Sequence, residues 1–114
     1  MLFRSISRRL FAAEETVHAP HLLDLEVAHV LRRYFLSGEL AAERGLEALE
    51  DLADFPLTRY PHDLFLPRIW ELCRNLTAYD AAYLALAETL AAPLLTRDRA
   101  LASSSGHTAK VELV

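Results

Sequence analysis

The sequence predicts one α/β domain over residues 1–114, in which helices flank a short parallel sheet. Segments whose apolar residues recur at helical spacing alternate with short β-prone runs, and strands separated by helices need crossover connections that favour parallel pairing. The chain has 114 residues, 53% of them apolar. This length and composition are typical of a globular protein with a single core.

The N-terminal half is predicted to alternate helices with two short strands. Residues 2–13 are predicted to form a basic, amphipathic helix, for which a transit peptide is the alternative interpretation. A β-prone run ends at Pro20, and the helix that follows carries Leu23, Val27 and Val30 on one face. The further predicted ranges are strand 17–19, helix 21–36, helix 39–53 and strand 57–60.

The C-terminal half repeats this alternation. Pro61 ends a strand and opens a helix that runs to about Arg74, and Pro93 ends a helix that begins near Thr77. A proline at a strand entry is tolerated because the first residue need not donate to the ladder. The predicted ranges are helix 61–74, helix 77–91, strand 94–96, a short helix from residue 98 and strand 109–113.

Charge and cysteine content limit the function classes. The formal net charge is −4, so a nucleic acid would bind at a local site rather than on a broad basic surface. Cys73 is the only cysteine, which excludes a disulfide framework within the chain and is typical of a cytoplasmic protein. Its position in a helical pattern predicts a small core residue. No apolar run is long enough to predict a membrane-spanning helix.

Three carboxylates depart from the rule that acidic residues lie on polar helix faces. Glu26 borders an apolar stripe, Asp80 shares a face with apolar residues, and Asp98 follows a strand at the edge where α/β sheets bind ligands. Each has a structural alternative. For Glu26 it is an ion pair with Arg33. For Asp80 it is a capping box begun by Thr77, and for Asp98 it is an N-cap of the next helix.

A shared site for these three side chains would predict a metal centre. Carboxylates that converge repel one another, and a hard divalent cation removes that repulsion. Mg²⁺ prefers oxygen ligands and also binds phosphate, and Mn²⁺ is the other expected ion. Such a site would activate a water for attack on a phosphodiester. Convergence itself does not follow from the sequence.

Three blocks of the sequence resemble the signatures of PIN-domain toxins of the VapC type. The blocks are LLDLEVAHVLRR, NLTAYDAAYLALAE and APLLTRDRAL, within a resemblance that covers residues 16–114. It implies a PIN-like fold and a Mg²⁺-dependent endoribonuclease toxin that cleaves RNA with metal-activated water. The residues matched to the family's catalytic metal ligands are Glu26, Asp80 and Asp98, and those expected beside the site are Thr96, Asn75 and Thr77.

The resemblance also implies a VapB-like antitoxin as partner, a homodimer and no membrane association. One departure stands out. Family members begin with a central strand that ends in an Asp, whereas no Asp precedes Asp24 here. The first strand and first acid are therefore expected to be missing, which would open a gap of about 10 Å in the sheet. A start codon upstream of Met1 and a truncated relative are the two expected explanations.

Two rival interpretations remain open. The chain could be a catalytically inactive PIN remnant that binds an antitoxin, in which case Mg²⁺ or Mn²⁺ would bind very weakly. It could also be a helical scaffold whose acids serve only as caps and ion pairs.

Overall fold

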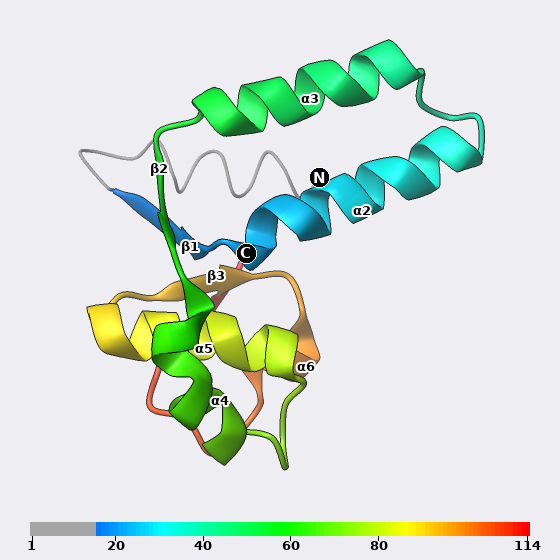
Figure 1. The fold of residues 1–114 in the computed structure, drawn as a ribbon. Helices are drawn as coiled ribbons and strands as arrows, with labels where there is room; N and C mark the ends of the chain where they lie inside the picture. The colour runs from blue at the N-terminus through cyan, green and yellow to red at the C-terminus, as the bar shows by residue number, and fades with distance from the viewer. Residues whose placement is uncertain (1–15) are drawn as a thin grey trace.

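A computed structural model describes residues 16–114, where short strands and helices alternate along the chain (Figure 1). The predicted helix over residues 2–13 lies outside this range. No helix within it is long and apolar enough to cross a membrane. The elements are β1 (Val17–Pro20), α2 (Leu22–Leu36), α3 (Ala42–Asp54), β2 (Leu57–Tyr60), the 3₁₀ turn η1 (His62–Phe65), α4 (Leu66–Glu71), α5 (Ala78–Leu90), β3 (Leu94–Thr96), α6 (Arg99–Ala102) and β4 (Val111–Leu113).

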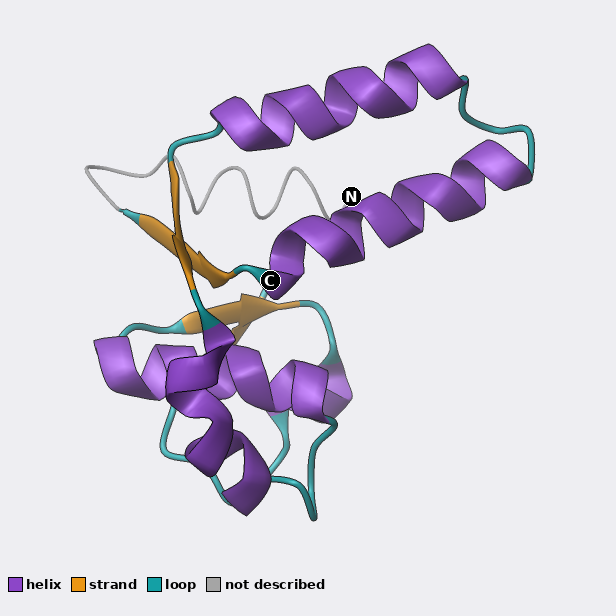
Figure 2. Cartoon of the chain, viewed as in Figure 1, coloured by secondary structure: helices purple, strands orange, loops and turns teal. Residues whose placement is uncertain are grey.

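The strands form two parallel pairs, not one continuous sheet (Figure 2). β1 pairs with β2, with Pro20 opposite Tyr60, and β3 pairs with β4, with Leu94 opposite Val111. Both pairs pack against α5. The parallel α/β class is confirmed, whereas the expected single sheet is divided in the described part of the chain.

Helix α5 is the centre of the hydrophobic core. Ala81 and Leu84 are fully buried, because α5 is apolar around most of its circumference and other elements cover it. The same core cluster includes Phe65 of η1, Ile69 of α4, Leu72 after α4 and Leu101 of α6. The core thus fixes the first turns of α5, where one of the predicted ligands lies.

The α2–α3 hairpin stands apart from this core (Figure 1). Neither helix has a fully buried residue. The face predicted to point inward is only partly covered, since Leu23 and Val27 are half-buried and Val30 is exposed. The hairpin therefore presents apolar surface over much of its length.

The predicted helix over residues 61–74 was wrong in its bounds. A 3₁₀ turn comes first, and α4 begins at Leu66 with Pro67 in its first turn and ends at Glu71. Proline is tolerated there because the first helical N–H groups have no partner in any case. Cys73 lies beyond the end of α4 and is exposed, so its prediction as a core residue was also wrong.

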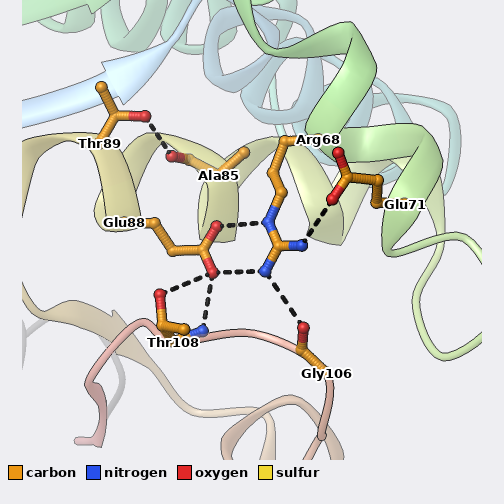
Figure 3. A network of polar contacts seen from close by, with 7 residues as sticks. All are labelled: Arg68, Glu71, Ala85, Glu88, Thr89, Gly106 and Thr108. Atoms are coloured by element: carbon orange, nitrogen blue, oxygen red, sulfur yellow. Dashed lines mark hydrogen bonds and ion pairs between the residues drawn. The ribbon is translucent and has the colours of Figure 1, made fainter.

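A polar network ties α4 and α5 to the loop before β4 (Figure 3). Arg68 of α4 donates from Nε and Nη2 to the two carboxylate oxygens of Glu88, at 2.8 and 2.9 Å. Glu88 also accepts from the backbone N and the hydroxyl of Thr108, at 2.7 and 3.0 Å. Arg68 further reaches the carbonyl of Gly106 and a carboxylate oxygen of Glu71. The two helices and the loop are held by one bidentate ion pair.

Candidate functional site

Glu26 lies in the N-terminal half of α2, half-buried, and faces α5. Its Oε1 accepts a hydrogen bond from the hydroxyl of Tyr83 on α5. Within the described residues no ion pair joins Glu26 to Arg33. The predicted alternative, an ion pair of Glu26 with Arg33 in the same helix, is therefore not observed. The carboxylate of Glu26 faces α5 instead.

Asp80 occupies the first turn of α5. Thr77 is the N-cap of this helix, and its hydroxyl accepts from the backbone N of Asp80 at 3.1 Å. This confirms the predicted cap at Thr77. The capping bond uses the backbone of Asp80, and its half-buried carboxylate has no hydrogen-bond or ion-pair partner among residues 16–114. Among the described residues, the cap therefore leaves both carboxylate oxygens of Asp80 without a partner.

Tyr83 links Glu26 of α2 to α5, the helix that also carries Asp80. Burial raises the pKa of Tyr83 far above its usual value, and the hydrogen bond to Glu26 raises it further. The negative charges of Glu26, Asp24 and Asp80 add to this effect. The hydrogen bond between Tyr83 and Glu26 brings α2 against α5 three residues after Asp80.

Asp24 is a further acid near this point that sequence reasoning missed. Its Oδ2 accepts from Nε of Arg59 at 2.7 Å, while its Oδ1 is buried with no partner in the described range. Arg59 also donates to the carbonyl of Leu52, and its hydrogen bond to Asp24 raises the pKa of its guanidinium. No local signal could have paired Asp24 with Arg59, because the contact joins α2 to β2.

Asp98 follows β3, as predicted, and is the N-cap of α6. Its Oδ1 accepts from the backbone N of Ala100 at 2.9 Å and of Leu101 at 3.2 Å. Thr96 braces this turn, since its hydroxyl accepts from the backbone N of Asp98 at 3.0 Å. The capping alternative is confirmed, yet it uses one oxygen of an exposed carboxylate. No contact between described residues joins Asp98 to Glu26 or Asp80, so their convergence stays a prediction.

Asn75 takes part in a loop contact. Its side-chain N donates to the carbonyl of Ser105 at 3.3 Å, which ties the turn before α5 to the loop before β4. The predicted place of Asn75 and Thr77 beside the site also stays a prediction.

The carboxylates of Glu26 and Asp80 are ligands of the type that a hard divalent cation prefers. No group of three or more His, Cys, Asp or Glu side chains within residues 16–114 is arranged to hold a metal ion. Mg²⁺, however, keeps several waters and is commonly bound by one or two carboxylates together with substrate phosphates. Glu26 and Asp80 supply carboxylates of this kind. That Glu26 and Asp80 hold such an ion together stays a prediction.

Comparison with known proteins gives one family. A model of the PIN domain matches residues 3–105. Ribonuclease VapC1 of Mycobacterium tuberculosis is 46% identical over 105 residues, which cover 89% of this chain and 77% of that protein. Ribonuclease VapC9 of the same organism is 42% identical over 108 residues, covering 95% and 84%. Ribonuclease VapC12 is 39% identical over 110 residues, covering 96% and 84%.

Proposed function

The chain belongs to the PIN domain family, and from this premise we propose that it is a Mg²⁺-dependent endoribonuclease, the toxin of a VapBC-type toxin–antitoxin pair. Its similarity to proteins named as VapC ribonucleases supports the activity. One observation in this molecule supports the proposal: the hydroxyl of Tyr83, three residues after Asp80 on α5, donates to Glu26 of α2, so the two helices that carry these expected ligands meet beside them. Cellular RNA as substrate would place the protein in the cytoplasm.

In the proposed reaction Glu26, Asp80 and Asp98 hold the cation, directly or through water. Mg²⁺, when bound, would supply a Lewis acid for the phosphodiester and lower the pKa of a water nucleophile; Mn²⁺ can replace it. The chain's own part is to fix the carboxylates. Thr96 and the N-terminus of α6 orient Asp98, whereas Thr77 fixes the turn that carries Asp80.

RNA has to be attracted locally, because the net charge of the chain is −4. The side chains of Arg97 and Arg99, on either side of Asp98, are exposed. Guanidinium groups bind phosphate in a bidentate manner, so this pair can position the backbone of the substrate beside the cation. Their number is too small for tight non-specific binding, which agrees with recognition at one site.

A cleavage assay tests the proposal. Full-length protein is incubated with end-labelled single-stranded RNA in Mg²⁺ or in EDTA, as wild type and as Asp80→Asn, Asp98→Asn and Asp51→Asn. Asp51 is an exposed acid of α3 and serves as the matched control. We expect Mg²⁺-dependent cleavage by the wild type and by the control, and a loss of at least about 100-fold in both site variants. Full activity in Asp80→Asn and Asp98→Asn would refute the assignment.

A VapB-like antitoxin is the proposed protein partner. An apolar groove of about 270 Å³ lies between α2 and α3, and its lining includes Leu31, Phe35, Leu46 and Leu49. A helix from a partner could lay its apolar face in such a groove. Exposed Trp70 on α4, with 77% of its surface accessible, supports the expected homodimer, since large aromatic residues are enriched at interfaces. Light scattering of the purified chain measures its mass in solution and so tests whether it forms a homodimer.

A catalytically inactive remnant that only binds an antitoxin is the second candidate. The observation in its favour is that the described residues contain no group of three or more potential ligands arranged around an ion. A Mn²⁺ titration separates the two candidates: the remnant would bind the ion very weakly, whereas the enzyme would bind it in a manner that depends on Asp80.

A further inference from the structure

Tyr83 is not one of the expected metal ligands, yet its side chain contacts one of them. It lies on α5 one turn after Asp80, so both side chains emerge on the same side of the helix. Its hydroxyl donates to Oε1 of Glu26 across the α2–α5 contact. Within the described residues this is the only hydrogen bond to the carboxylate of Glu26. Tyr83 thus joins the two helices that carry Glu26 and Asp80.

The hydrogen-bond donor to Glu26 is a neutral phenol, and this choice of donor suits a metal ligand. A glutamate side chain loses about 1.5–2 kcal/mol of rotamer freedom when it is fixed, so an unsupported Glu26 would hold a cation poorly. An arginine at this place would fix the carboxylate but would also neutralise it and repel the cation. A phenol fixes one carboxylate oxygen, adds no charge and leaves the second oxygen, Oε2, available. Hydrogen bonds to metal-ligating carboxylates commonly have this role.

We propose that Tyr83 is a positioning residue, whose hydroxyl holds the carboxylate of Glu26 in the orientation in which Glu26 and Asp80 face the same divalent cation. This inference rests on the proposed function and assigns a role to a residue outside the ligand set.

The alternative is that Tyr83 only anchors α2 on α5. The two roles differ in what the loss of the hydroxyl changes. An anchor would change the stability of the fold and leave cation affinity intact. A positioning residue would change cation affinity, and only while Glu26 is present to be positioned.

The test is Mn²⁺ binding by the full chain, measured by calorimetry or by the electron paramagnetic resonance of free Mn²⁺, with thermal melts in parallel. The variants are Tyr83→Phe, Glu26→Gln and the double variant. Tyr79→Phe is the matched control, since Tyr79 lies on the same helix and is 62% exposed. We expect Tyr83→Phe to weaken Mn²⁺ binding about 10-fold, the control to bind like the wild type, and Tyr83→Phe to have no further effect in the Glu26→Gln background.

The outcomes separate the inference from the function on which it rests. If Asp80→Asn loses Mn²⁺ binding while Tyr83→Phe binds as tightly as the wild type, the positioning role is refuted and the metal site stands. If Tyr83→Phe weakens binding equally in the presence and absence of Glu26, the hydroxyl does not act through that carboxylate and the inference is also refuted. If the wild type binds no Mn²⁺, the proposed function fails and the inference fails with it.

Discussion

The ion pair between Arg68 and Glu88 is expected to be a principal stabilising contact of the fold. The side chain of Glu88 is only 12% exposed. The hydrogen bonds from Arg68, together with those from Thr108, lower the pKa of Glu88 from 4.5 to about 2. Each pKa unit corresponds to about 1.4 kcal/mol, so the ionised carboxylate stabilises the folded state by about 3 kcal/mol at neutral pH.

The sign of the pH dependence follows from the direction of this shift. A carboxylate whose pKa is lowered by folding contributes its full stabilisation above the unfolded value of 4.5 and loses it as the pH falls towards about 2. At pH 3 about half of the contribution should remain. Glu88→Gln removes the charge and presents an amide N to donors, so we expect a loss of about 2–3 kcal/mol at pH 7.

Urea unfolding followed by circular dichroism at pH 7 and pH 3 measures both quantities. Glu47→Gln is the control, because Glu47 is 65% exposed and its contact with Arg44 is long, at 3.5 Å; we expect a change below about 0.5 kcal/mol. The loss in Glu88→Gln corresponds to a fall in Tm of about 10–20 °C. A cost below about 0.5 kcal/mol at pH 7, or a cost that does not shrink at pH 3, would show that the reasoning about this network is wrong.

Two further predictions concern single residues. Asp98→Asn should remove RNA cleavage while the Tm stays within a few degrees of the wild type, since asparagine caps a helix about as well as aspartate; a large fall in Tm would mean that the charge is needed for the fold. Ala91 ends α5 with a positive φ of 50°, a conformation that costs an L-residue about 1–2 kcal/mol. Ala91→Gly should therefore stabilise the fold by about 0.5–1 kcal/mol in urea unfolding, and a destabilised variant would contradict this account.

Features governed by local chemistry were predictable from the sequence. The strands at 57–60 and 94–96 have the predicted bounds, because prolines and β-prone residues delimit them. The caps at Thr77 and Asp98 were also predictable, since each is set by the few residues that follow it. The parallel pairing followed from the alternation of strands and helices.

Features that depend on contacts between distant segments were not predictable. The bonds from Tyr83 to Glu26 and from Arg59 to Asp24 join elements far apart in the chain. Periodicity indicates which face of a helix is apolar, but not which side chain it meets. Cys73 fits a helical pattern, yet α4 ends at Glu71, before it. The acids of the candidate site were found by type and by family resemblance, whereas the donor that holds Glu26 required coordinates.

The central claim is that Glu26, Asp80 and Asp98 share one divalent cation. Anomalous diffraction from crystals of the full chain grown with Mn²⁺ tests it most directly. The account predicts one strong peak within about 2.5 Å of carboxylate oxygens of Glu26 and Asp80, with Asp98 reached directly or through one water. A peak at another place, or side chains of these three residues that point into separate regions of the molecule, would contradict it.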